Sequence, residues 1–242
     1  MGRAFEFRKA RKFKRWAAMS KTFARLNKDI IIAIREGNSS DADTNPRLRA
    51  VLQNCRAANM PKDNVERAIK KATDKDASDF KEVNFEGYAP HGIAVFVETA
   101  TDNNNRTVAN VRSHFNKCNG NLGTSGSVEF MFDHVCFFKI KAEGVDKDEL
   151  ELELIDFGAE EVEQDEEALL ITGTFESFGQ LQSKLEGDGM EIIESGLERV
   201  PNITKALGPD ETAEVEKLIE RLEEDDDVQN VFHTMSSSTE GE

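Results

Sequence analysis

Apolar residues with a helical period dominate the first third of the chain. One stripe recurs at spacings of three and four and predicts an amphipathic helix that ends near Gly37: Met19, Phe23, Leu26, Ile30 and Ile34. A second helix is expected from Pro46, behind the capping residue Asn45, and a third from Pro61. Residues 1–79 are therefore expected to form a helical domain.

From Phe80 the apolar period changes to two, which is typical of strands. Strands are predicted at 83–87 and 93–99, and the alternation of Val128, Phe130 and Phe132 predicts another. One helix lies between the last two of these strands, with Val108, Val111 and Phe115 facing inward. Residues 80–133 thus supply one helix for three strands. The helix from Pro209 and the strand at 228–232 are expected to complete this sheet, so the second domain combines 80–133 with 207–235.

The intervening residues 134–206 follow a β-α-β-β-α-β pattern, which is the order of a ferredoxin-like unit. In its first helix Leu150, Leu154 and Ile155 are expected to face inward. The predicted fold class is α+β, with an N-terminal helical domain followed by two ferredoxin-like α+β domains, the third inserted in the second. The last residues, 236–242, are expected to be a disordered tail.

Charge is divided sharply along the chain. The net charge of the 242 residues is −16, yet residues 1–75 hold 19 Lys/Arg against 8 Asp/Glu, a net charge of +11, and residues 76–242 have a net charge of −27. The most acidic stretch, 143–167, holds 13 acids and one lysine. Contact with phosphates depends on the local charge of a surface and not on the total charge of the protein. The acidic net charge of the chain therefore does not exclude a nucleic-acid partner for residues 1–75.

The basic N-terminal arm, residues 3–28, has ten cations against the single acid Glu6, with Phe5, Phe7, Phe13 and Trp16 between them. Such a run can neutralise phosphates and stack on bases, and a one-signed run repels itself unless a polyanion is present. Two other interpretations are a solvated helix face and a mitochondrial transit peptide, although cleavage of a leader would remove the start of the helical domain. The predicted nucleic-acid-binding residues are Arg3, Arg8, Lys9, Arg11, Lys12, Lys14, Arg15, Lys21, Arg25, Lys28, Arg47, Arg49, Arg56, Lys62, Arg67, Lys70 and Lys71.

Two loops are further candidates for contact. The polar segment 101–107 joins a buried strand to a helix, where it forms an Asx-rich cap or holds a phosphate of ribosomal RNA through Asn103, Asn105, Arg106 and Thr107. The Gly-rich segment 120–126 lacks the Gly-Lys-Ser/Thr end of a phosphate-binding loop and is interpreted as a flexible connector.

The sequence shows no motif for metal binding, disulfide formation or catalysis. The four histidines are isolated, and the three cysteines Cys55, Cys118 and Cys136 form no CxxC pair, so we expect free thiols, no metal and no cofactor. No catalytic motif is visible, which predicts a protein that is not an enzyme. Apolar runs are short and no secretory signal is present, so a cytoplasmic protein without membrane contact is expected. The acidic stretch is expected to face away from nucleic acid or to contact basic proteins.

Several motifs in order along the chain resemble the YebC/PmpR family. They are Asn45-Pro46-Arg47-Leu48-Arg49, residues 57–69 (AANMPKDNVERAI), Glu86-Gly87-Tyr88, the 101–107 loop, residues 119–128, and residues 226–231 (DDVQNV). The resemblance implies a helical domain followed by two α+β domains, with the third inserted in the second.

The resemblance also implies two alternative functions. The family is described as DNA-binding transcriptional regulators, and its members, including a mitochondrial translational activator of cytochrome c oxidase, are also linked to ribosomes and to translation through proline-rich stretches. The expected partners are therefore double-stranded DNA, ribosomal RNA, or both. This chain departs from the family's Gly-His-Ser-Lys-Trp-like start with Gly2-Arg3-Ala4-Phe5-Glu6-Phe7, and at 89–92 it has Ala-Pro-His-Gly in place of a more glycine-rich turn.

Overall fold

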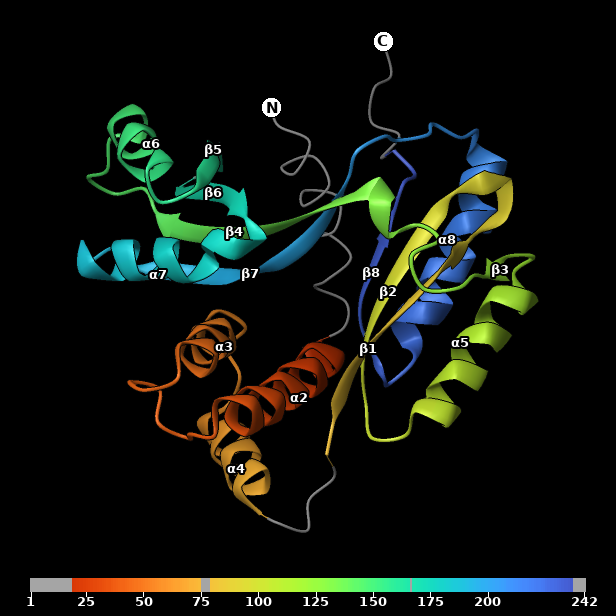
Figure 1. The fold of residues 1–242 in the computed structure, drawn as a ribbon, viewed down its shortest axis with the longest axis horizontal. Coiled ribbons are helices and arrows are strands. Elements are labelled where there is room, and N and C mark those ends of the chain that lie inside the picture. The colour runs from red at the N-terminus through yellow and green to blue at the C-terminus, as the bar shows by residue number, and fades with distance from the viewer. Residues whose placement is uncertain (1–18, 75–78, 166, 237–242) are drawn as a thin grey trace. The chain divides into compact units, whose positions relative to one another are not determined.

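A computed structural model describes residues 19–74, 79–165 and 167–236 (Figure 1). It confirms the α+β class, with an N-terminal helical region followed by two four-stranded sheets. The helical region consists of α2 (Met19–Gly37), α3 (Pro46–Ala57) and α4 (Lys62–Thr73). Leu26, Ile30 and Ile34 of the predicted stripe are buried. Both α3 and α4 contact α2, so the stripe forms the centre of this region.

Asn45 joins the end of α2 to the start of α3. Its side-chain oxygen accepts from the N–H of Leu48 at 3.0 Å, which caps α3. Its amide donates to the carbonyl of Ala33 at 2.8 Å and to that of Ser39 at 2.9 Å. Asn45 is buried, and a Cβ at Gly37 would lie 2.4 Å from its amide nitrogen. The connection from α2 to α3 therefore depends on an asparagine and on the glycine that makes room for it.

The first sheet has the order β3-β1-β2-β8, and the end of the chain completes it (Figure 1). Strand β8 pairs antiparallel with β2, with Phe96 opposite Phe232 and Val97 opposite Val231. Residues from both helices share one apolar core with the strands, among them Phe115 and Leu218. The elements are β1 (Lys81–Tyr88), β2 (Ala94–Thr101), α5 (Asn104–Lys117), β3 (Asn121–Leu122), α8 (Pro209–Glu224) and β8 (Val228–His233).

The second sheet is formed by the inserted residues and has the order β5-β6-β4-β7. In chain order these strands are the second, third, first and fourth, which is the ferredoxin-like arrangement predicted from the sequence. Leu154 of α6 and Leu181 of α7 are fully buried in a core with the strands. The elements are β4 (Phe132–Lys141), α6 (Lys147–Ile155), β5 (Ala159–Asp165), β6 (Ala168–Thr174), α7 (Phe178–Gly187) and β7 (Ile192–Pro201).

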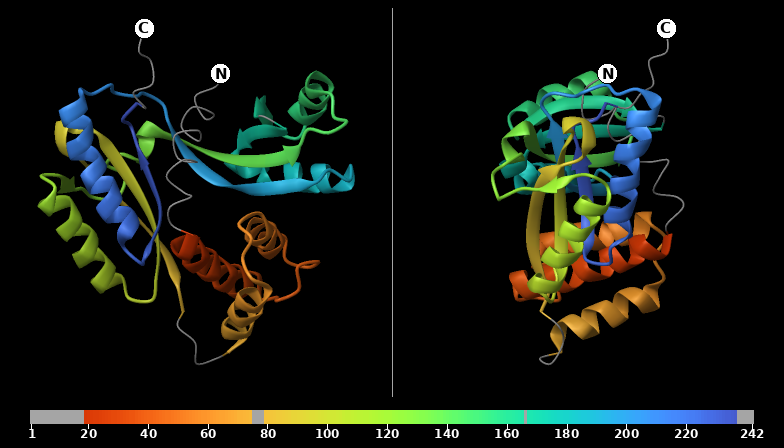
Figure 2. Two further views of the ribbon diagram at one scale, coloured as in Figure 1. Left: turned by 180° about the vertical axis from the view of Figure 1, so that it is seen from behind. Right: turned by 90° about the vertical axis from the view of Figure 1, so that its right-hand side faces the viewer.

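The described residues fall into two compact units. The first unit combines 19–74 with 134–199, and the second combines 79–133 with 200–236; both can be followed in the two views of Figure 2. The three domain boundaries expected from the sequence stay a prediction. No described helix is both long and apolar enough to span a membrane. The three cysteines are buried free thiols, as predicted, and burial raises the pKa of Cys55 to about 11.

Within the first unit, α3 contacts the ferredoxin-like sheet through two polar side chains. Asn54 of α3 donates to the carbonyl of Ser195 at 2.7 Å and accepts from its N–H at 3.0 Å. Ser195 belongs to β7, which lies at the edge of its sheet. The guanidinium of Arg49 donates to Glu186 at 2.9 Å. Each bond joins residues more than a hundred positions apart in the sequence.

Two details of the predicted pattern are wrong. Residues 129–131 form a 3-10 turn instead of a strand, and Phe130 is 72% exposed. The N–H groups of Val128 and Glu129 both donate to the side chain of Glu86, so they are not available to a strand partner. Ile155 is 57% exposed rather than inward, because it lies about 100° round the helix from the buried Leu154.

We predict that Asn45→Ala destabilises the protein by about 3 kcal/mol, because it removes a helix cap and leaves the Ala33 carbonyl buried without this donor. Urea unfolding followed by circular dichroism measures the change. Ser40→Ala, an exposed position in the same loop, is the control and is expected to stay within about 0.5 kcal/mol of the parent. Equal stability of the two variants would contradict the role assigned to Asn45.

Candidate nucleic-acid interface

The predicted phosphate-binding residues divide between described and undescribed parts of the chain. Ten lie on the three helices of the helical region, which are Lys21, Arg25 and Lys28 on α2, Arg47, Arg49 and Arg56 on α3, and Lys62, Arg67, Lys70 and Lys71 on α4. We call these ten the helical cations. The other seven lie outside the described residues, namely Arg3, Arg8, Lys9, Arg11, Lys12, Lys14 and Arg15.

Four of the helical cations form no ion pair with any residue in 19–74, 79–165 or 167–236, namely Lys21, Arg56, Arg67 and Lys70. Arg67 donates instead to the side chain of Asn64, so the other three are available for an external anion. Arg56 and Lys70 are exposed. Lys70 lies in the last turn of α4, where the helix dipole also favours a cation, so part of its role is structural.

Other helical cations are engaged within the protein. Arg47 pairs with Glu36. Arg49 binds Glu186 at 2.9 Å and the carbonyl of Ala42 at 2.8 Å, and its side chain is only 28% exposed. Arg49 is therefore positioned as a structural contact of α3, which the sequence alone did not indicate.

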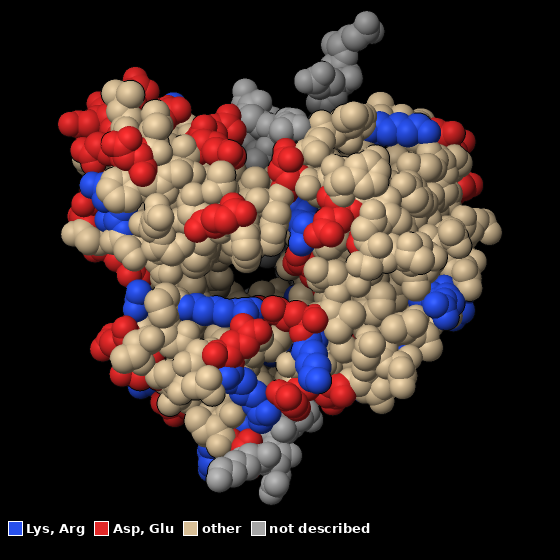
Figure 3. Space-filling model, viewed as in Figure 1, with Lys and Arg blue, Asp and Glu red and all other residues tan. Residues whose placement is uncertain are grey.

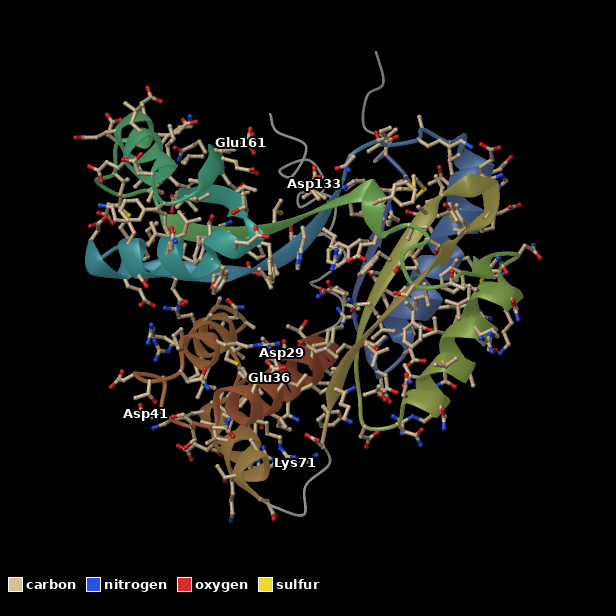
Figure 4. The ribbon with its side chains drawn as sticks, in the orientation of Figure 1. Asp29, Glu36, Asp41, Lys71, Asp133 and Glu161 are labelled. Carbon is tan, nitrogen blue, oxygen red and sulfur yellow. The ribbon has the colours of Figure 1, made fainter. Side chains whose placement is uncertain are left out.

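Acidic side chains lie among the helical cations. Figure 4 labels Asp29 and Glu36 on α2, Asp41 in the following loop and Lys71 on α4, and Figure 3 shows red beside blue on this region. The density of positive charge here is lower than in residues 3–15, which carry seven cations and one acid. The strongest positive field expected from the sequence therefore comes from the arm before α2.

The connection between α3 and α4 is short. Only residues 58–61 separate the two helices, and Asn59 has a left-handed φ of 55°. A turn of three or four residues between two helices is the connection found in helix-turn-helix modules. The structure thus places α4, with Lys62, Arg67 and Lys70, directly after such a turn.

The 101–107 loop is organised around a buried carboxylate. Asp227 accepts from Thr107 at 2.8 Å and from Arg106 at 2.8 Å and 3.0 Å, and its side chain is 6% exposed. These bonds raise the pKa of Arg106 above its usual value. Asn103 caps α5 by accepting from the N–H of Arg106 at 3.2 Å. The Asx-rich cap expected for this segment is present, and Asn105 is exposed, as are Asn103 and Asn104. Binding of an anion here stays a prediction.

The Gly-rich segment is anchored, not a free connector. Glu86 is buried, and its carboxylate accepts from the N–H groups of Gly126 at 2.6 Å, Val128 at 2.7 Å and Glu129 at 2.8 Å. The carbonyl of Glu86 also accepts from the N–H of Gly123 at 2.7 Å. One carboxylate thus binds the main-chain N–H groups that follow strand β3 and fixes the shape of this part of the loop.

Three residues relevant to a functional surface were missed by the sequence analysis. They are Glu86, which shapes the Gly-rich loop, and Arg112 and Lys117, which are exposed on α5. The signal that could have identified the two cations is the absence of any acid from residue 103 to residue 128. Among the residues that the structure describes, no group of His, Cys, Asp and Glu could hold a metal ion.

Two protein-family models together match almost the whole chain. Residues 3–75 match the TACO1/YebC protein N-terminal domain, and residues 80–235 match the TACO1/YebC second and third domain. This chain belongs to the TACO1/YebC family. The resemblance found in the sequence motifs is therefore confirmed.

Relatives in the family are similar over their full length. A probable transcriptional regulatory protein of Flavobacterium johnsoniae is 66% identical over 97% of this chain and 99% of its own length. One of the same description from Porphyromonas gingivalis is 57% identical over the whole of both chains. A crystal structure of a conserved hypothetical protein from Aquifex aeolicus is 38% identical, covers 90% of each chain and superposes with a TM-score of 0.76.

We predict that Glu86→Gln loosens the Gly-rich loop, because an amide offers one acceptor oxygen and directs its own N–H groups at backbone donors. The expected cost is about 2 kcal/mol, and amide hydrogen exchange should become faster at Gly126, Val128 and Glu129. Glu220→Gln, on the exposed face of α8, is the matched control. Unchanged exchange in the loop would show that Glu86 does not anchor it.

Proposed function

We propose that this protein is a non-enzymatic, cytoplasmic regulator of gene expression that binds nucleic acid, with duplex DNA as its first target. The observation that carries the proposal is the segregation of charge, with +11 in residues 1–75 and −27 in the remainder. The names of the relatives, probable transcriptional regulatory proteins, support regulation of transcription as the process.

The proposed binding mode is electrostatic contact with the phosphate backbone. The cations of residues 3–15 and the exposed helical cations neutralise phosphates and release condensed counterions, which makes the affinity depend steeply on salt. The α3–α4 turn supports duplex DNA, with α4 as the helix that meets it. The acidic remainder is repelled by the same polyanion, so it orients the protein with its first third toward the DNA.

The absence of catalysis belongs to this proposal. Its support is the description of the relatives as regulators and the lack of a catalytic motif in the sequence. A regulator that binds through charge needs no cofactor.

A second candidate function is a ribosome-associated translation factor, which would help elongation through difficult, proline-rich stretches. The observation that favours it is a surface on α5 in the second unit, where exposed cations and amides occur without acids. In this second function the helical cations of α2, α3 and α4 would contact ribosomal RNA instead of DNA.

The test of the proposed function is reversal of the unpaired helical cations. We predict that Arg56→Glu combined with Lys70→Glu lowers the affinity for a duplex DNA of arbitrary sequence at least about tenfold and reduces the slope of log K against log salt by roughly two, since each B-DNA phosphate contact contributes about 0.9. Fluorescence anisotropy over a salt series measures both. Reversal of Arg8, Lys9, Arg11 and Lys12 together is expected to have a larger effect.

The matched control is Lys81→Glu combined with Lys217→Glu, which changes the net charge equally at exposed positions of the second unit. If this control weakens binding as much as the helical variant, the interface is not in the helical region. Sedimentation of the protein from gently lysed cells separates the two candidate functions, because comigration with ribosomal particles supports translation and sedimentation as free protein supports transcription.

A further inference from the structure

Residues 103–128 differ in composition from everything around them. This stretch of 26 residues contains no Asp or Glu, although residues 76–242 have a net charge of −27. It contains three cations, Arg106, Arg112 and Lys117, and seven asparagines. A chain that is acidic elsewhere therefore keeps one helix and the following loop free of negative charge.

Helix α5 displays this composition on one face. Val111 and Phe115 are fully buried against the first sheet, which turns the opposite side of the helix to solvent. Asn105, Ala109, Arg112 and Asn116 follow each other at spacings of four, three and four and are all exposed. We call these four residues with Ser113 and Lys117 the α5 face.

The α5 face is a shallow, open surface that carries no acidic side chain. Ala109, Arg112, Ser113, Asn116 and Lys117 line a shallow hollow of about 440 Å³. In Figure 3 the surface over α5 is tan and blue. The small side chain of Ala109 allows a ligand to approach the helix backbone closely.

The cations of α5 are used in two different ways. Arg106 is held by Asp227 and Asp102. By contrast, Arg112 and Lys117 form no ion pair with any residue of the described ranges. The protein thus neutralises one of the three α5 cations internally and leaves two exposed on the α5 face.

The balance of charges and amides indicates which polyanion fits. A protein that binds duplex DNA through the phosphate backbone commonly makes roughly six to ten phosphate contacts. Two unpaired cations are few for such a surface. Asparagine and serine side chains both donate and accept hydrogen bonds. RNA offers partners for them that DNA lacks, namely the ribose 2′-hydroxyl groups.

We propose that the α5 face is a second nucleic-acid contact and that its ligand is RNA, with Arg112 and Lys117 on phosphates and Asn105 and Asn116 on ribose 2′-hydroxyl groups. The inference rests on the proposed function in that it assumes a nucleic-acid-binding regulator. It adds a second surface, on the other unit, with a stated ligand class.

The test uses the full chain and two probes, a short labelled RNA hairpin and the DNA hairpin of the same sequence. We expect Arg112→Glu with Lys117→Glu to lower RNA affinity about tenfold, and Lys81→Glu with Lys217→Glu to lower it much less. We expect Asn105→Ala with Asn116→Ala to lower RNA affinity about fivefold and to leave DNA affinity unchanged, because these amides bind groups that DNA lacks. Thermal melting checks that all variants stay folded.

Each remaining outcome has a defined meaning. If both α5 variants keep the RNA affinity of the parent, the inference is overturned. The proposed function still stands in that case, provided that the Arg56→Glu, Lys70→Glu variant loses DNA binding. Equal losses on RNA and DNA in the asparagine variant also overturn the ligand class. Retention of a cellular protein that depends on Arg112 and Lys117 and survives ribonuclease identifies a protein partner instead. A parent chain that binds neither hairpin overturns the inference and the proposed function together.

Discussion

The pairing of β8 with β2 is the contact on which the arrangement of the chain depends. It joins residues more than 130 positions apart, such as Val97 and Val231, and it makes the sheet that begins at Lys81 continuous with the end of the chain. Closing so long a loop costs conformational entropy, and the apolar core that α8 adds offsets that cost. The buried Asp227 then bonds to Thr101 and Thr107, so the same return of the chain also organises the start of α5.

Much of this fold could be predicted from local pattern. The stripe of α2, the Asn45 cap and the six-element order of the inserted unit each follow from residues close together in sequence. The turn at 129–131 could not, because Val128, Phe130 and Phe132 have the period of a strand. What decides their conformation is Glu86, more than forty residues earlier, which takes the N–H groups that a strand would pair. A side chain that replaces a strand partner leaves no periodic signal.

The candidate surfaces show a similar division. The helical cations could be identified as a group from the charge run, but their partners could not, and Arg49 proves to be bound to Glu186. The α5 face could be predicted only in part. The sequence shows that it lacks acids, but its exposure depends on the inward packing of Val111 and Phe115. Charge composition thus indicates which class of ligand a segment can bind. Tertiary packing determines which cations of that segment remain available for binding.

The amide of Asn54 has a consequence beyond joining α3 to the inserted unit. Strand β7 forms one border of its sheet, and a border strand presents unsatisfied main-chain groups to which a strand of another molecule can add. Asn54 occupies both main-chain groups of Ser195, donating to one and accepting from the other as a neighbouring strand would. A helix side chain thereby takes the place of a one-residue strand and closes the middle of that border to the addition of a strand from another molecule.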